Sequence, residues 1–113
     1  MTIQMVLKII AALATAATGL LGFTKPTATF GFIGLNANGA RGISEIRAIF
    51  GGLFIALGIA PLFLGPVAYR MLGIGYLAIA FTRSISIVMD KSYAQSNIIS
   101  LVTEIVLGVV LVI

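Results

Sequence analysis

Residues 67–89 read VAYRMLGIGYLAIAFTRSISIVM, a stretch that is apolar over most of its length. A helix needs about 20 predominantly apolar residues to cross a bilayer. Comparable stretches lie on both sides of it, and we predict four helices, over residues 5–23, 44–64, 67–89 and 96–113. The sequence therefore predicts an all-α fold, an integral membrane four-helix bundle that forms a single domain over residues 1–113.

The composition of the chain points to lipid as its main solvent. Hydrophobic residues make up 60% of the 113 residues and charged residues 9%, whereas a soluble domain carries about 25% charged residues. The net charge is +4, but the basic residues are scattered along the edges of the apolar stretches, where they meet headgroups or set topology. Because they form no cluster, we expect no nucleic-acid partner.

The residue types that the chain lacks narrow its chemistry. It has no cysteine and no histidine, and its only acidic residues are Glu45, Asp90 and Glu104. This composition excludes disulfides, a thiolate nucleophile and the commonest general base. We therefore expect no metal site, no cofactor and no enzymatic activity. A third hypothesis, an enzyme acting on lipids, would need one of these carboxylates as its general base.

The connections predict how the helices follow one another. Gly65-Pro66 and residues 90–95 are short turns, which favour an antiparallel, up-down order of the helices they join. Residues 24–43 form a much longer connection than the usual 2–8 residues or so of a bundle, and they include apolar residues such as Phe32. We expect this long first loop to cap one end of the bundle, through Asn36, Asn38 and Arg41, and Ser44 to begin the second helix as its N-cap.

Small residues recur at helical spacing on the first two predicted helices, where they would let helix backbones approach closely in lipid. They are Ala12, Ala16 and Gly19 on the first helix and Gly52, Ala56 and Ala60 on the second. Packing within the bundle and oligomerisation both account for these stripes.

Polar residues on the last two helices match in depth. Arg83, Ser86 and Asp90 have the same offsets, 0, 3 and 7, as Asn97, Ser100 and Glu104, so each trio shares one helix face. In an antiparallel hairpin, residues at equal depth have position numbers with a constant sum. The sum is 187 both for 90 and 97 and for 83 and 104. We predict an ion pair between Arg83 and Glu104 inside the bundle, because either charge alone would be costly there.

The second helix adds charge in the same half of the bundle. Glu45 and Arg47 are two residues apart and cannot share a helix face, and the sequence leaves open which of them points inward. The predicted ligand-binding site or buried polar network comprises Glu45, Arg47, Arg83, Ser86, Asp90, Asn97, Ser100 and Glu104. A network that only fixes helix register and a pocket for a ligand are both consistent with this set.

Three segments resemble a known family. GLNANGARGISEIRAIFGG (34–52), YRMLGIGYLAIAFTRSISIVMD (69–90) and SLVTEIVLG (100–108) resemble a bacterial family of small four-helix membrane proteins of unknown function that is distantly DoxX-like. The resemblance implies four transmembrane helices and a bacterial inner (plasma) membrane location. It implies no reaction. DoxX-like proteins are associated with quinone or redox membrane complexes, but no cofactor motif is visible in this chain.

Two functions compete. The first is binding of a lipid-like or amphiphilic anionic ligand, or of a membrane partner, at the Arg/Glu cluster, with membrane lipid, an amphiphilic small molecule and a second copy of the chain as candidate partners. The alternative is a small transporter with Glu104 as the ion- or proton-coupled site. Small multidrug transporters are superficially similar, but they use a glutamate in the first helix, where this chain has only Thr15 and Thr18 as interior polar residues.

Overall fold

The regular structure in residues 2–113, which the computed structural model describes, is entirely helical. The elements in chain order are α1 (Ile3–Thr24), the 3₁₀ turn η1 (Pro26–Thr29), α2 (Phe30–Ile33), α3 (Gly39–Glu45), the π-helical segment η2 (Ile46–Leu53), α4 (Phe54–Leu64), α5 (Pro66–Met89) and α6 (Gln95–Val112). α3, η2 and α4 continue into one another and form a second long helix, Gly39–Leu64.

Four of these helices are long and apolar enough to cross a membrane: α1, the second long helix, α5 and α6. Their outward faces are strongly apolar, since large side chains such as Leu13, Phe81 and Val106 are half or more exposed. Soluble monomers rarely leave so much contiguous apolar surface in contact with water. The fold is therefore compatible with a membrane protein.

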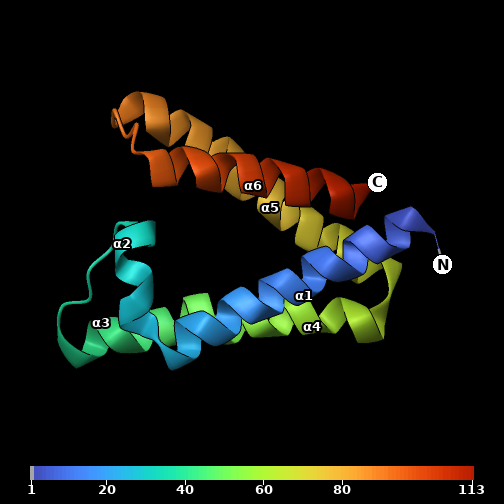
Figure 1. Ribbon diagram of the computed structural model, residues 1–113, viewed down its shortest axis with the longest axis horizontal. Helices are drawn as coiled ribbons and strands as arrows, with labels where there is room; N and C mark the ends of the chain where they lie inside the picture. The colour runs from blue at the N-terminus through green and yellow to red at the C-terminus, as the bar shows by residue number, and fades with distance from the viewer. Residues whose placement is uncertain (1) are drawn as a thin grey trace.

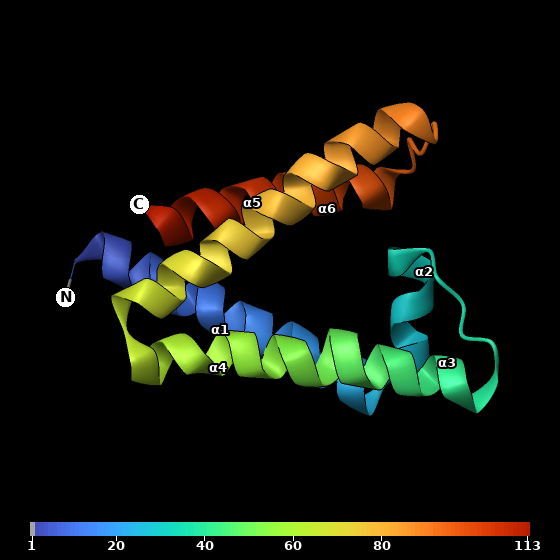
Figure 2. The ribbon, with the colours of Figure 1, turned by 180° about the vertical axis from the view of Figure 1, so that it is seen from behind.

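The four long helices form a wedge made of two helix pairs. α1 packs along η2 and α4, and α5 packs along α6. Figure 1 and Figure 2 show the two pairs meeting near the chain termini and the α4–α5 turn, and diverging toward α2. The short turn at Gly65 therefore joins two helices that separate from each other beyond it.

Glycines explain why α1 lies so close to the second long helix. A Cβ atom added to Gly22 would lie 2.6 Å from the Phe50 carbonyl oxygen, and one added to Gly58 would lie 2.6 Å from the Ala12 carbonyl oxygen. The two backbones are thus in direct contact, as small residues allow in helix packing.

Only one of the two predicted small-residue stripes makes this contact. Gly19 on α1 lies against Gly51 and Ile55, whereas Gly52 and Ala56 on the second long helix are exposed. Packing within the bundle therefore does not account for the stripe on the second helix, and oligomerisation through it stays a prediction. The contact uses Gly51 and Gly58, because a glycine permits closer backbone approach than the alanines of the predicted stripe.

The long connection contains more helix than a loop would. It begins with η1 and α2, and α2 ends at Gly34, whose φ of +79° is the left-handed conformation that commonly ends a helix. The next long helix starts at Gly39, so Ser44 lies inside it and is not its N-cap. The ion pair between Arg41 and Glu45, one helical turn apart, supports this earlier start.

The closed end of the wedge contains the hydrophobic core. Its buried residues come from α1, α5 and α6 and are Ala11, Ala12, Tyr69, Leu72 and Leu111. At the open end, α2 stands in the gap between the helix pairs (Figure 1) and contacts α6. The space between the pairs is therefore closed by packed side chains at one end and bounded by α2 at the other.

Candidate functional site

Arg83 on α5 and Glu104 on α6 are at the centre of the candidate site. The Arg83 Nε atom donates to Glu104 Oε1 at 2.8 Å, and Nη2 donates to Oε2 at 2.7 Å. The predicted ion pair is present, in the bidentate geometry that gives the strongest arginine–carboxylate contacts. Glu104 is 9% exposed, and breaking a buried ion pair by removing one partner is strongly destabilising.

Asn97 extends the network to the turn between α5 and α6. Its Oδ1 atom accepts a hydrogen bond from Arg83 Nη1 at 2.7 Å. Its Nδ2 atom donates to the Ser92 carbonyl oxygen at 3.1 Å and to Ser92 Oγ at 3.0 Å. Two residues of α6 thereby hold Arg83, and Asn97 connects Arg83 to the turn between α5 and α6.

The Arg83 guanidinium has donors beyond those that this network uses. A guanidinium carries five N–H groups, and three of them make the hydrogen bonds to Glu104 and Asn97. Within residues 2–113, no further acceptor for Arg83 is found. The remaining two N–H groups have no protein acceptor there, and the side chain is 31% exposed.

These donors adjoin a cavity of about 480 Å³ between the two helix pairs, which we call the polar chamber. Its volume lies within the range of about 300–1,000 Å³ that is usual for ligand pockets. The side of α5, α6 and their turn contributes Arg83, Ser86, Ser92, Ala94, Ser96, Asn97, Ser100 and Glu104. The opposite side contributes Thr18, Phe32, Ile33, Gly34, Phe50 and Phe54. The chamber is therefore polar on one wall and largely apolar, with three aromatic rings, on the other.

Two more of the predicted residues, Ser86 and Ser100, line the polar chamber with the Arg83 network. Asp90 is exposed at the end of α5, where it accepts a hydrogen bond from Ser86 Oγ at 2.7 Å. The structure thus gathers Arg83, Ser86, Asn97, Ser100 and Glu104 in one place and connects Asp90 to them through Ser86.

Glu45 and Arg47 do not join this group. Glu45 pairs with Arg41 on the exposed side of α3. Arg47 is exposed, donates from Nη1 to the Phe23 carbonyl oxygen at 2.5 Å and lies over the Phe23 ring. It thus satisfies one of the carbonyl groups that every helix C-terminus leaves open, here that of α1. The expectation that one of the two faces the interior is wrong, because the second long helix turns its glycines toward α1.

The predicted capping residues also lie away from the polar chamber. Asn36 lines a separate surface hollow next to Glu45, and Asn38 is exposed just before α3. The connection instead reaches the chamber through Phe32, Ile33 and Gly34 in and just after α2. This segment forms a helical turn, whereas the sequence predicts a loop there.

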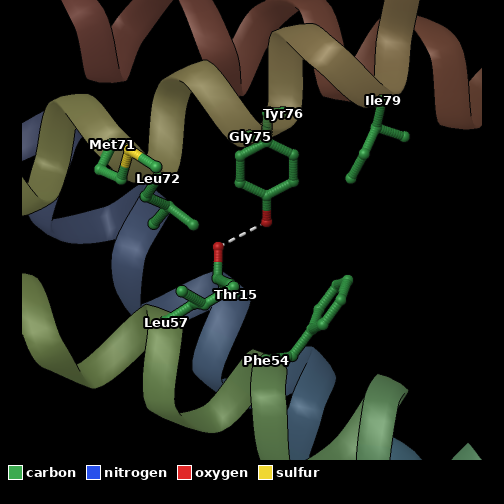
Figure 3. Close-up of a pocket in the computed structure, with 8 residues that line it drawn as sticks. All are labelled: Thr15, Phe54, Leu57, Met71, Leu72, Gly75, Tyr76 and Ile79. Atoms are coloured by element: carbon green, nitrogen blue, oxygen red, sulfur yellow. Dashed lines mark hydrogen bonds between the residues drawn. The ribbon is translucent and has the colours of Figure 1, made fainter. Parts of the chain in front are cut away.

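Sequence reasoning missed a second polar contact inside the wedge. Thr15 on α1 and the Tyr76 hydroxyl on α5 are 2.5 Å apart, and Thr15 Oγ1 also donates to the Ala11 carbonyl oxygen. Figure 3 shows this bond crossing the space between α5 and α1. The available signal was the presence of a threonine and a tyrosine in the middle of two apolar helices, where polar groups need partners.

The Thr15–Tyr76 bond lies in a cavity of about 180 Å³, which we call the apolar cavity. Its lining residues come mainly from α4 and α5 and are Thr15, Phe54, Leu57, Met71, Leu72, Gly75, Tyr76 and Ile79 (Figure 3). Within residues 2–113, no group of three acidic, histidine or cysteine side chains is placed to hold a metal ion. The residues that line the two cavities offer hydrogen bonds, charge and apolar contact.

The fold and the site define a small all-helical protein with four potential membrane spans and a buried arginine–glutamate pair. The chain belongs to the family described as Domain of unknown function (DUF4345), whose model matches residues 3–113. No curated protein and no solved structure matches the chain significantly.

Proposed function

We propose that this chain is an integral membrane protein that binds an anionic amphiphile in the polar chamber. Its four long helices would cross the bilayer in alternating directions, and their exposed apolar faces support contact with lipid. The resemblance of SEIRAIFGG (44–52) to a bacterial, distantly DoxX-like family supports a bacterial plasma membrane as the location.

The observation that carries the proposal is the pair of remaining Arg83 donors in a chamber with one apolar wall. A planar guanidinium suits a carboxylate or phosphate group, and the hydroxyl of Ser100 adds a donor nearby. Phe50 and Phe54 on the other wall suit the apolar part of the same molecule. Glu104 holds Arg83 in position and offsets its charge when the chamber is empty.

Native mass spectrometry of the purified protein with the single-chain lipids lysophosphatidylglycerol, lysophosphatidic acid and lysophosphatidylcholine tests the proposal. We expect the wild type to retain the two anionic lipids in preference to the zwitterionic one. The double variant Arg83→Gln/Glu104→Gln removes both charges together, and it should lose this preference. Arg70→Gln, which removes an exposed charge at the start of α5, is the matched control and should keep it.

A folded double variant with unchanged lipid preference would contradict the proposal. Circular dichroism and thermal melting of each variant establish whether it is folded. The native mass spectra also report the mass of the protein assembly, which decides whether a second copy of the chain is a partner.

The alternative function is transport coupled to ions or protons at Glu104. The burial of Glu104 within an apolar helix favours it. Against it, Arg83 engages both carboxylate oxygens of Glu104, so neither oxygen is free to bind a transported ion. Proton-coupled uptake of a substrate by liposomes, lost in Glu104→Gln, would replace ligand binding by transport as the function.

A further inference from the structure

The apolar cavity and the polar chamber are neighbours that share Phe54 as a lining residue. Arg83 lines the chamber, and Ile79, Tyr76 and Leu72 line the apolar cavity. These positions are separated by three or four residues, so they follow one side of the helix. A molecule with its charged end at Arg83 therefore has an apolar path leading away from that end.

The length of this path matches one hydrocarbon chain. Arg83 and Leu72 are eleven positions apart, which is about 16 Å at a rise of about 1.5 Å per residue. This is close to half of the hydrocarbon thickness of about 30 Å, the depth that one acyl chain fills in one leaflet. The volume of the apolar cavity, about 180 Å³, is smaller than the about 300–1,000 Å³ of pockets that enclose whole drug-sized ligands. It suits a narrow chain rather than two chains or a ring system.

We propose that the ligand is a single-chain amphiphile with a carboxylate or phosphate headgroup. Its headgroup contacts Arg83 in the polar chamber, and its tail passes Phe54 into the apolar cavity beside Tyr76. This inference rests on the function proposed above, because it assumes that the headgroup is held at Arg83. It adds the number of chains and the position of the tail.

Gly75 offers a way to fill the tail site without disturbing the fold. It lines the apolar cavity, and a Cβ atom added to it would have no atom within 4 Å. Gly75→Leu therefore places a side chain in the cavity, and leucine also favours the helix over glycine. Ala17→Leu, at an exposed position on α1 that lines neither cavity, is the matched control.

The test measures binding of alkyl phosphates from octyl to hexadecyl, and of the matching fatty acids, at one fixed detergent concentration. At this fixed concentration each ligand partitions into micelles equally in every sample. The ratio of the variant's affinity to that of the wild type is therefore free of this effect. We expect Gly75→Leu to bind octyl phosphate as the wild type does and to bind hexadecyl phosphate about tenfold more weakly, because forcing extra methylenes into an occupied apolar site is costly. Ala17→Leu should match the wild type at every length.

The outcomes separate the two proposals. If Gly75→Leu binds all chain lengths as the wild type does, the tail does not occupy the apolar cavity and this inference is wrong, while the headgroup site stands. If the wild type binds no amphiphile, or if Arg83→Gln/Glu104→Gln binds them equally well, the proposed function itself is wrong. The fatty acids and the alkyl phosphates distinguish the two headgroup chemistries.

Discussion

Arg83 makes two kinds of contact at the scale of single residues. It holds Glu104 and Asn97 of α6 by three hydrogen bonds, and its side chain lines the polar chamber. A variant that removes only Arg83 therefore also leaves the buried Glu104 carboxylate without its partner. Structural and ligand-binding effects separate only when both charges are removed together.

The stability of the arginine variants gives the first prediction. Arg83→Ala should lower the free energy of unfolding by about 3 kcal/mol, since loss of one member of a buried ion pair leaves an uncompensated charge. Arg83→Gln/Glu104→Gln should lower it by clearly less, because no charge remains buried. Denaturant-induced unfolding in detergent micelles measures both, and equal losses in the two variants would contradict a buried pair.

The hydrogen bond between Thr15 and Tyr76 gives the second prediction. Tyr76→Phe removes it but leaves Thr15 its bond to the Ala11 carbonyl oxygen. We expect a loss of about 0.6 kcal/mol, the average for hydrogen bonds between helices in a membrane. Tyr93→Phe, at an exposed position in the turn before α6, is the control and should leave the midpoint of thermal unfolding unchanged.

The site was predictable where residues are close in the chain. The register of one hairpin fixes Arg83 opposite Glu104, so equal offsets on two helices sufficed to pair them. The position of Glu45 depended instead on where a helix begins, and that start lies five residues before Ser44. Thr15 and Tyr76 belong to helices that no short turn connects, so nothing local in the sequence brings them together.

Backbone contact between α1 and the second long helix dominates at the scale of elements. Gly58→Val would place its Cβ 2.6 Å from the Ala12 carbonyl oxygen, and backbone cannot move aside as a side chain can. We expect a loss of stability of about 3 kcal/mol, at the upper end for overpacking. Gly75→Val, where a Cβ meets nothing within 4 Å, should change the midpoint of thermal unfolding far less, and similar losses for both would contradict the close approach.

The same contact explains why the pairing of helices was harder to predict than their number. Runs of apolar residues determine the four long helices, and this needs no knowledge of neighbours. The short turn at Gly65 indicated that α4 and α5 are neighbours throughout, but the glycines of α1 give the second long helix a closer partner. The two helices joined at Gly65 therefore diverge, and the chamber lies in the space that results.

At the scale of the whole molecule, the wedge assigns different roles to its two ends. The core residues, such as Tyr69 and Leu111, are at the closed end, whereas the Arg83 network is beside α2 at the open end. The chamber has walls from both helix pairs. A ligand there would contact both pairs at once, so we expect binding of hexadecyl phosphate to raise the midpoint of thermal unfolding of the wild type but not of Arg83→Gln/Glu104→Gln.

The proposed four crossings place the open and closed ends of the wedge on opposite sides of the membrane. Because the chain has no cysteine, single cysteines can report this directly. Asn38→Cys and Tyr93→Cys lie at the open end, and Ile3→Cys and Ile113→Cys lie near the chain termini, all at exposed positions.

A membrane-impermeant maleimide applied to sealed vesicles should label the two single-cysteine variants at one end of the wedge. The two variants at the other end should stay unlabelled until detergent opens the vesicles. The unmodified protein, which has no thiol, gives the background. Labelling of the cysteines at positions 3 and 38 from the same side would mean that α1 does not cross the membrane. A helix that lies along the surface would also expose Arg83 to water, and the low-dielectric surroundings that strengthen its contacts to an anion would then be absent.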